Sequence, residues 1–417
     1  MRLSFMNHKE KRKQFYQKIP HYWADLYGQE YSLYDVHPVT EQEASTIRTT
    51  TTRVGHLFFK TAGLLRQIDD DLLLSLGFPA SSLRFLRIRQ TNLESVIARL
   101  DLVQVDDRYV VLEINSDTPT FLKELFFVND RICKEFGYKN PNEGEEKRLQ
   151  QAVQAAIFIS LQSIVPNNVD SPHIVFTSHA DNQEDRYTVE YLRELAQVPS
   201  CYVPLHELQI VDGEGLYDAG GKRIDLLYRQ TYPIEQMVAD YDPNTKDPVG
   251  EMLLELVARR RLAMLNPISA FLLQSKAIQA VIWGLHEEQH PFYSSEEHAW
   301  IAEHFLPTYL EPDLFQQQGT AYVRKPAFGR EGDTVQIIKG DAILHEDINK
   351  SYTDYLSVYQ RYVPLPTTYV QTVEKVVKGH LMVGSFLING QASAFGYRLG
   401  GPITDNMAYF LPCGYQR

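Results

Sequence analysis

Two short stretches of the sequence, 97–105 and 109–115, alternate apolar and polar residues, and only Asp106-Asp107-Arg108 separates them. A period of two is typical of strands, so this spacing predicts a β-hairpin. Arg99 and Asp101 share one face of the first strand. The second strand is expected to divide in the same way, with Glu113 and Asn115 on one face and Val110, Leu112 and Ile114 on the other.

The register of this hairpin decides whether its polar faces form a site. Asp101 meets Glu113 only if the connecting loop has an odd length and is centred near Asp107. The same register pairs Arg99 with Asn115. Opposed carboxylates about 5 Å apart repel each other unless a cation lies between them. Oxygen ligands of this kind suit Mg²⁺, which completes its shell with water and nucleotide phosphates. The alternative is a hairpin face that is simply solvated.

The hairpin leads into a polar segment, Ser116-Asp117-Thr118-Pro119-Thr120. Short hydroxyl and carboxylate side chains in a turn suit the binding of a polar ligand. The alternative interpretation is a helix N-cap that leads into the apolar residues from Phe121 onward.

A glycine-bearing loop between two predicted strands forms a second motif at 324–335. Pro326 holds Lys325 extended at the end of the first strand. Gly329 and Gly332 allow a tight loop whose backbone N–H groups can approach an anion. The segment is not a Walker loop, because the GK[ST] ending is missing and a strand follows where a helix is required. A hairpin lid over nucleotide phosphates is one interpretation, and an ordinary hairpin turn is the other.

A third pattern, His286-Glu287-Glu288-Gln289-His290, matches the H-E-x-x-H helix of zinc peptidases. That chemistry needs both histidines one turn apart on a continuing helix. Pro291 disfavours the α conformation at His290, so the second ligand is expected to lie off the helix end. We therefore expect no zinc peptidase site, and no GxSxG motif indicates a serine hydrolase.

Composition excludes several classes of function. The 417 residues carry 41 Lys and Arg against 53 Asp and Glu, a net charge of -12, which argues against general nucleic-acid binding. The apolar run 152–165 is interrupted by polar residues and falls short of the roughly 20 residues that a membrane helix needs. No secretory signal is visible, and three widely spaced cysteines suggest reduced thiols. These features predict a cytoplasmic protein that binds neither nucleic acid nor membrane.

The order of predicted elements indicates a mixed α/β and α+β chain. Residues 1 to about 95 are expected to be mainly helical. The segment 172–230 alternates short strands with helices, which is typical of a parallel α/β unit. The C-terminal segment from 321 onward is rich in predicted strands, and Asn389-Gly390 is a type I′ hairpin signal.

At these motifs the sequence resembles the glutathionylspermidine synthetase family of ATP-grasp amide ligases. The family's metal hairpin reads Arg-x-Asp, then Glu-x-Asn-x-Asp-[Ser/Thr], with 14 residues from the arginine to the glutamate. The spacing from Arg99 to Glu113 is also 14. The lid motif Lys-Pro-x-x-[Gly/Ser]-Arg-x-Gly is matched by 325–332. Weaker matches are Tyr228-Arg229, Asn266-Pro267, Gln274-Ser275-Lys276 and the strands from Gly384 to Asn406.

The resemblance implies an ATP-grasp fold with a Rossmann-like pre-ATP-grasp domain. The expected domains are 1–165, which holds the N-terminal helices and the metal hairpin of the ATP-grasp core, and 166–265, the pre-ATP-grasp domain. The third, 266–417, is the nucleotide-binding part, with a lid around 320–365.

The resemblance also implies roles for individual residues. Magnesium would be held by Asp101, Glu113 and Asn115. ATP would be bound by Lys276, Lys325, Gly329, Gly332 and the backbone after Gln371. The catalytic residues would be Arg99, Arg330 and Arg398. The substrates would contact Thr118, Thr120, Glu184 and Asp185.

The function that follows is an ATP- and Mg²⁺-dependent carboxylate–amine ligase, which forms an amide through an acyl phosphate. Its partners would be a small-molecule or peptide carboxylate and an amine, which the sequence does not name, and it leaves the oligomeric state open. The acidic residues usual after the last arginine are replaced by Leu399-Gly400-Gly401, which puts polyamine specificity in doubt. The alternative is a non-catalytic relative that binds a nucleotide or a peptide.

Overall fold

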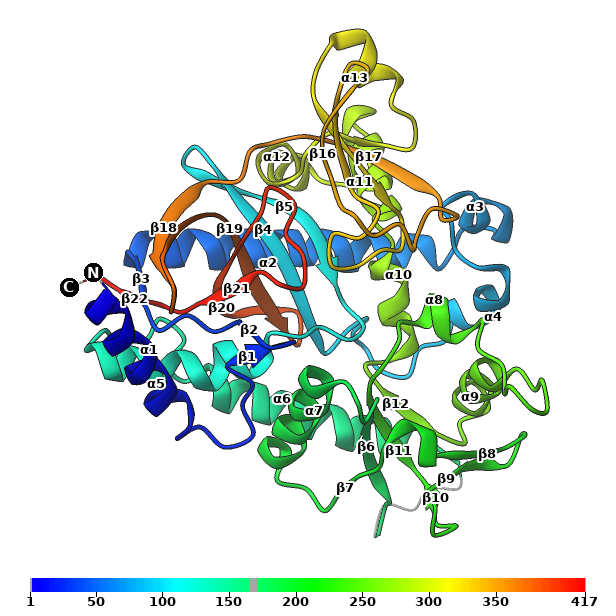
Figure 1. Cartoon of the computed structure of the whole chain (residues 1–417). Helices are drawn as coiled ribbons and strands as arrows, with labels where there is room; N and C mark the ends of the chain where they lie inside the picture. The colour runs from blue at the N-terminus through cyan, green and yellow to red at the C-terminus, as the bar shows by residue number, and fades with distance from the viewer. Residues whose placement is uncertain (1, 166–170, 417) are drawn as a thin grey trace.

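The computed structural model describes residues 2–165 and 171–416 (Figure 1). Its N-terminal part contains α1 (Arg2–Tyr16) and the long helix α2 (Glu41–Leu65). Thr40 and Glu43 form a reciprocal capping box at the start of α2. A Cβ at Gly55 would lie 2.5 Å from Leu387, so this glycine lets α2 pack closely against the sheet that holds Leu387.

A six-stranded antiparallel sheet joins the hairpin to the C-terminal strands. Its order is β21-β20-β19-β4-β5, and β18 also pairs with β19. The strands are β4 (Ile97–Val105), β5 (Arg108–Asn115), β18 (Thr367–Gln371), β19 (Val376–Ile388), β20 (Gln391–Gly400) and β21 (Tyr409–Leu411). Asp101 on β4 lies opposite Gly384 on β19. Segments far apart in the sequence therefore build the floor of one site.

A four-stranded parallel sheet has the order β12-β11-β6-β7. Its strands are β6 (Ile174–Ser178), β7 (Cys201–Tyr202), β11 (Leu226–Gln230) and β12 (Ala263–Leu265). Phe176 belongs to the same core as residues of α6 (Glu145–Gln162) and α7 (Gln183–Ala196), whereas Val175 belongs to a core with α9 (Val249–Ala258). Helices therefore cover both faces, as the Rossmann-like prediction requires.

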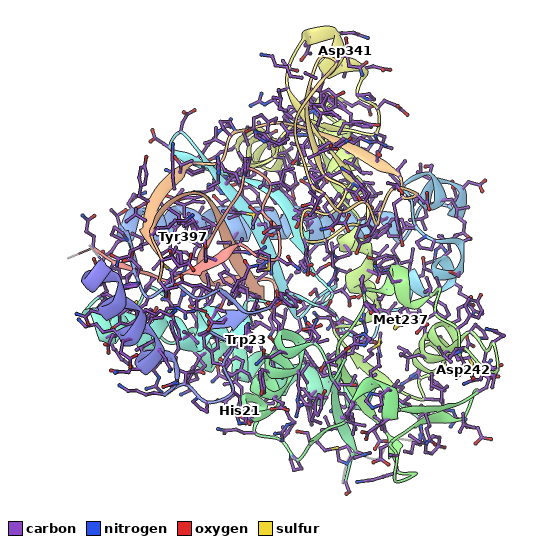
Figure 2. All side chains as sticks on the ribbon, in the orientation of Figure 1. His21, Trp23, Met237, Asp242, Asp341 and Tyr397 are labelled. Atoms are coloured by element: carbon purple, nitrogen blue, oxygen red, sulfur yellow. The ribbon has the colours of Figure 1, made fainter. Side chains whose placement is uncertain are left out.

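A third sheet projects from the body of the molecule at the top of Figure 1. Its order is β13-β17-β14-β15-β16. The strands are β13 (Thr308–Tyr309), β14 (Tyr322–Pro326), β15 (Gln336–Lys339), β16 (Ala342–Glu346) and β17 (Ser357–Arg361). Figure 2 shows Asp341, in the turn between β15 and β16, at the outer end of this sheet and away from Tyr397 on β20.

The remaining elements connect these three sheets. The short strands are β1 (Asp25–Leu26), β2 (Gln29–Glu30), β3 (His37–Val39), β8 (Gln209–Val211), β9 (Gly215–Tyr217), β10 (Arg223–Ile224) and β22 (Cys413–Tyr415). The helices are α3 (Asp70–Ser75), α4 (Leu83–Leu86), α5 (Asn129–Phe136), α8 (Ile234–Met237), α10 (Phe271–Gln274), α11 (Ala277–Glu287), α12 (Ser295–His304) and α13 (Asp313–Gln318). Single turns of other helix types are η1 (Ala80–Ser82), η2 (Glu124–Val128), η3 (Leu205–Glu207) and η4 (Ile268–Ala270).

The H-E-x-x-H pattern does not lie on one helix. Helix α11 ends at Glu287, so His290 lies beyond it, as the proline argument predicts. The Nδ1 atom of His286 instead lies 3.1 Å from Nδ1 of His298 on α12. The H-E-x-x-H pattern therefore spans the C-terminal end of helix α11.

Within 2–165 and 171–416, no single helix is long and apolar enough to cross a membrane, and only the bent pair 268–274 and 277–287 meets that threshold jointly. The domain boundaries at 165/166 and 265/266 stay a prediction, and 166–170 lie outside the described residues.

Candidate active site

The hairpin has the predicted register at the site but reaches it differently. Asp101 pairs with Glu113 and Arg99 with Asn115. The loop, however, is a two-residue turn and not the expected odd-length loop, because Val105 pairs directly with Arg108. A bulge between these two regions shifts the register by one residue. The predicted pairing of the carboxylates is thus confirmed, and the predicted loop is wrong.

Because of the bulge, the predicted faces of β5 are wrong. Val110, Leu112 and Ile114 were expected to share one face, but Val110 and Leu112 belong to one apolar cluster and Ile114 to another. The extra residue in β5 changes the face on which the following side chains lie. The carbonyl oxygen of Leu112 accepts hydrogen bonds from Lys325 Nζ at 2.8 Å and Gln279 Nε2 at 3.0 Å. A carbonyl at a bulge is available for such side-chain partners because the ladder is locally disrupted.

Arg99 and Asp101 form a buried two-pronged ion pair. Arg99 Nε lies 2.7 Å from Asp101 Oδ1, and Nη2 lies 3.1 Å from Oδ2. A third contact joins Arg99 Nη1 to the carbonyl oxygen of Thr120 at 3.1 Å. Burial disfavours the charged guanidinium, but Asp101 outweighs this and raises the pKa of Arg99. Arg99 is therefore a fixed cation on the floor of the site.

Two lysines lie over Glu113. Lys276 Nζ is 3.2 Å from Glu113 Oε2 and 2.6 Å from the carbonyl oxygen of Gly329. Burial alone would raise the pKa of Glu113, but Lys276 and Lys325 hold it below its ordinary value. Burial lowers the pKa of Lys325 to about 7, although Glu113 opposes the fall. Gln360 Oε1 accepts a second hydrogen bond from Lys325 at 2.9 Å.

The loop between β14 and β15 closes over these groups. Arg330 Nη1 donates to Thr118 Oγ1 at 2.9 Å, so the loop contacts the segment that follows the hairpin. Gly332 has a φ of 77°, and a Cβ there would lie 3.0 Å from the carbonyl oxygen of Thr404 and 2.8 Å from Ile403. Glycine is required at this position both by the backbone conformation and by the close packing.

A group of acidic side chains lies at the other end of the site. Burial, together with Glu124 and Asp185, raises the pKa of Glu184 to about 8. Burial raises the pKa of Asp185 to about 7, although Arg330 opposes the rise. Both residues open helix α7, which follows the carboxyl end of β6. Burial outweighs the nearby arginines at both carboxylates, and such carboxylates favour a positively charged ligand.

One cavity of about 180 Å³ brings most of the predicted residues together. Its lining includes the predicted Arg99, Asp101, Glu113, Asn115, Thr118, Thr120, Glu184, Lys276, Lys325, Gly329, Arg330, Gly332 and Arg398. Asp185 lies close by but does not line the cavity, and Gln371 ends β18 away from it. From the end of β17 to the start of β18, the cavity is lined by 360–363 and Leu365. The predicted adenine contact at Gln371 is therefore not brought to this cavity.

The family model of glutathionylspermidine synthase pre-ATP-grasp matches residues 4–416. The chain belongs to this glutathionylspermidine synthase family. Its membership confirms the predicted relationship and supports a ligase-type function.

Two solved structures are similar to this family member. One is a glutathione synthetase-like effector from Globodera pallida in its apo form, with 10% identity, a TM-score of 0.64, and coverage of 100% of this chain and 98% of that one. The other is a putative gamma-glutamylcysteine synthetase from Methylobacillus flagellatus KT, with 10% identity, a TM-score of 0.42 and coverage of 90% and 89%. With the family match, the first of these confirms the predicted ATP-grasp fold.

The residues of the hairpin fit a magnesium ion by their chemistry. Asn115 Oδ1 is buried and has no hydrogen-bond partner within the described ranges. It shares the face of Asp101 and Glu113, whose carboxylates contact Arg99 and Lys276 respectively. Amide and carboxylate oxygens are the hard oxygen ligands that Mg²⁺ prefers. Among residues 2–165 and 171–416, no group of three His, Cys, Asp or Glu side chains has metal-binding geometry, and the predicted set contains two carboxylates and one amide.

Two buried groups beside the cavity of this family member are not among the residues predicted from the sequence. Asp117 Oδ1 lies 2.6 Å from Arg229 Nη2, and both side chains are almost fully buried. Glu235 on α8 is only 3% exposed. Asp117 and Arg229 belong to motifs that the sequence analysis quoted, so a pairing could have been suspected. Glu235 carries no sequence signal, because it follows Pro233 in an unremarkable short helix.

Proposed function

We propose that this family member is an ATP- and Mg²⁺-dependent carboxylate–amine ligase that forms an amide through an acyl phosphate. The observation that carries the proposal is the cavity that Lys276, Lys325 and Arg330 line together with the carboxylates of the hairpin. Phosphoryl transfer requires positioning and charge neutralisation more than covalent help from the protein. Three cations from three different elements supply that charge.

The lysines would bind ATP before reaction. Lys325 is held at a strand end by Leu112 and Gln360, and Lys276 is held by Gly329. Both nitrogens therefore have fixed positions, which suits ground-state binding of phosphate oxygens. Asp101, Glu113 and Asn115 would hold Mg²⁺, which supplies further charge for the phosphate oxygens when bound.

The reacting groups would lie between the hairpin floor and the lid. A carboxylate oxygen of the substrate attacks the γ-phosphorus, the bond from that phosphorus to the β–γ bridging oxygen breaks, and ADP leaves. The amine nitrogen, in its neutral form, then attacks the acyl carbon, the bond to the phosphate oxygen breaks, and the proton lost from nitrogen goes to the released phosphate. Arg99, Arg398, Thr118 and Thr120 are proposed to contact the carboxylate or the acyl phosphate.

The amine would be bound at the acidic end of the cavity. Glu184 and Asp185 lie there with raised pKa values, of about 8 and about 7, caused mainly by burial. A cationic amine nearby would favour their ionised forms and so bind while displacing protons. Arg398, whose Nη2 donates to the carbonyl oxygen of Asp405 at 2.5 Å, is the cation at this end.

The test is phosphate release from ATP across a panel of carboxylates and amines, with the amide product identified by mass. Turnover that needs both a carboxylate and an amine supports the ligase. Nucleotide binding without turnover under any pair would favour the non-catalytic alternative. Lys325→Ala and Arg330→Ala serve as matched variants, because contaminating ATPases would be unaffected by either substitution.

A further inference from the structure

Tyr31, which the proposed mechanism does not use, lines the cavity. It follows β2 and is 5% exposed. Its hydroxyl donates to Glu124 Oε1 at 2.7 Å. Its backbone is fixed as well, because its N–H donates to the carbonyl oxygen of Ala24 at 3.1 Å and its carbonyl oxygen accepts from the N–H of Phe410 at 2.9 Å. Tyr31 is therefore held at both its backbone and its hydroxyl.

The carboxylate that receives this hydrogen bond is deeply buried. Glu124 is the first residue of η2, is 0% exposed and does not itself line the cavity. Its Oε2 atom has no hydrogen-bond partner in the described ranges. The neighbouring Lys123 directs its Nζ atom to the carbonyl oxygens of Pro20 and His21, at 2.9 and 2.6 Å. Tyr31 is therefore the link between Glu124 and the cavity.

The hydrogen bond to Glu124 determines what the hydroxyl of Tyr31 can offer to a ligand. A phenol has one O–H donor and also accepts through its oxygen. Because the proton is directed to Glu124, only the acceptor capacity of the oxygen is left for a ligand in the cavity. Burial, Glu124 and Glu184 raise the pKa of Tyr31, although Arg398 opposes the rise, so the hydroxyl keeps its proton at neutral pH. Tyr31 therefore presents an acceptor to the cavity and not a donor.

An acceptor of this kind suits a nucleophilic amine. A neutral primary amine has two N–H donors and one lone pair, and the lone pair must attack the acyl carbon. A hydrogen-bond donor in the wall would bind that lone pair and oppose the attack. An acceptor instead takes an N–H and leaves the lone pair free. Glu184, which lines the same cavity, is a second acceptor for N–H groups when ionised.

We propose that Tyr31 binds the amine substrate through its phenolic oxygen, and that Glu124 is a positioning residue that keeps the hydroxyl in this acceptor role. The amine then donates an N–H to Tyr31 and keeps its lone pair for the acyl carbon. Tyr31 thereby contributes to specificity for an amine over a ligand without N–H groups. This inference rests on the proposed function, in which an amine attacks an acyl phosphate.

The first test removes the oxygen and keeps the ring. With the amine that supports turnover in the panel, Tyr31→Phe should lower kcat/KM for the amine about tenfold, which corresponds to the loss of one hydrogen bond, and should leave KM for ATP nearly unchanged. Tyr22→Phe is the matched control, because the Tyr22 hydroxyl lies 2.6 Å from Ser32 Oγ and Tyr22 does not line the cavity. An unchanged kcat/KM for the amine in Tyr31→Phe would overturn the inference.

The second test addresses the positioning role. Glu124→Gln keeps the shape of the side chain, but its amide can donate as well as accept, so the hydroxyl of Tyr31 is no longer restricted to accepting from the ligand. Glu124→Gln should lower kcat/KM for the amine in the wild-type background and should have no further effect in the Tyr31→Phe background, because its target is gone. Equal losses in both backgrounds would overturn the positioning role.

A binding measurement separates this inference from the proposed function. Butylamine is added to the protein at neutral pH, and the rise in melting temperature is compared with that from the same concentration of sodium butyrate. Butylamine should stabilise the wild type and Tyr22→Phe more than it stabilises Tyr31→Phe, whereas butyrate should not distinguish the variants. Equal shifts with butylamine overturn the inference even if the protein is an active ligase. A wild type without turnover whose response to butylamine depends on Tyr31 would refute the proposed function alone.

Discussion

The Nζ atom of Lys325 lies 2.8 Å from the carbonyl oxygen of Leu112, the residue at the bulge of β5. This contact joins the lid sheet to the hairpin and holds the lysine above Glu113. Lys325 is 5% exposed, so its charge is costly unless an anion is near. The carbonyl group at the bulge therefore holds the Lys325 amino group in place without neutralising its positive charge. A cation of this kind is a suitable partner for a phosphate.

Removal of this amino group should weaken ATP binding. Lys325→Ala should raise the Kd for Mg²⁺–ATP about tenfold or more, because a fixed, buried cation is lost from the phosphate site. The exposed Lys339→Ala on β15 is the control and should bind ATP normally. Equilibrium titration with ATP measures both. An unchanged Kd in Lys325→Ala would remove Lys325 from the ATP site.

The lysine should also link ATP binding to protons. Burial lowers the pKa of Lys325 to about 7, so above pH 7 much of the free protein carries it uncharged. Bound phosphates favour the charged form and raise that pKa, so binding at pH 8 should take up protons. Affinity should consequently fall as the pH rises above 7. Calorimetry at pH 8 in buffers of different ionisation enthalpy should detect the uptake in the wild type and a smaller uptake in Lys325→Ala.

Arg330 should contribute mainly to the transition state. Arg330→Ala should lower turnover by roughly 10²-fold or more, with a smaller effect on ATP binding, because the loop brings this cation to the phosphoryl group only when the lid is docked. Arg324→Ala is a matched control from the same lid strand, where the side chain is exposed and contacts Ser357. Steady-state kinetics at saturating ATP test this. Near-normal turnover in Arg330→Ala would contradict the lid assignment.

Gly332 should be needed for the lid to dock. Its φ of 77° disfavours other residues, and an added Cβ would meet the backbone of Thr404 at 3.0 Å. Gly332→Ala should therefore lower kcat while leaving the melting temperature of the protein nearly unchanged, since the lid loop is at the edge of the fold. Gly340→Ala, in the turn before β16, has the same sign of φ but open space around it. Gly340→Ala therefore measures the effect of backbone strain alone, whereas Gly332→Ala combines that strain with the clash against 403–404.

The hairpin shows how far the sequence could predict this site. Strand alternation placed Asp101 and Glu113 on one face, and the structure pairs them. The bulge at Leu112 could not be predicted, because no residue type in the sequence marks it. It is recognised only as a shift in the pairing register between β4 and β5. The two-residue loop alone would put Glu113 out of register with Asp101. The bulge at Leu112 shifts the register by one residue, so the two departures from the prediction cancel and Glu113 still pairs with Asp101.

Other parts of the site depend on tertiary packing that the sequence does not encode locally. The lid motif 325–332 was visible because glycine and proline restrict the backbone in known ways. Gln371 lies outside the cavity, while Gln360 lines it. Both are glutamines near the end of a strand, so the local sequence does not distinguish them. Glu235 was missed because only its burial makes it unusual.

Substitution of Asn115 should weaken the binding of Mg²⁺, and not only the binding of the nucleotide. Its unpartnered Oδ1 atom is proposed as a ligand, so Asn115→Ala should raise the Mg²⁺ concentration that gives half-maximal turnover about 10-fold to 100-fold. The protein should remain folded, because no described hydrogen bond of this amide oxygen is lost. A titration with MgCl₂ at fixed ATP tests this. An unchanged Mg²⁺ requirement would exclude Asn115 from the metal site.

The ion pair between Asp117 and Arg229 should be the most sensitive point for stability near the cavity. Asp117 Oδ1 lies 2.6 Å from Arg229 Nη2, and the side chains are 0% and 1% exposed. Asp117→Ala would leave a buried guanidinium without its counter-charge, which typically costs about 3–5 kcal/mol. Urea denaturation should therefore show a lower midpoint, and the exposed pair variant Glu346→Gln should change it far less.

The double variant Asp117→Leu with Arg229→Met distinguishes two explanations for that loss. If the cost arises from the stranded charge, removing both charges should restore much of the stability, because apolar side chains can replace a buried pair. If the cost arises instead from a specific geometry that the pair imposes on the 116–118 segment, the double variant should be as unstable as Asp117→Ala. Turnover measured in parallel shows whether Thr118, one residue away, still receives Arg330.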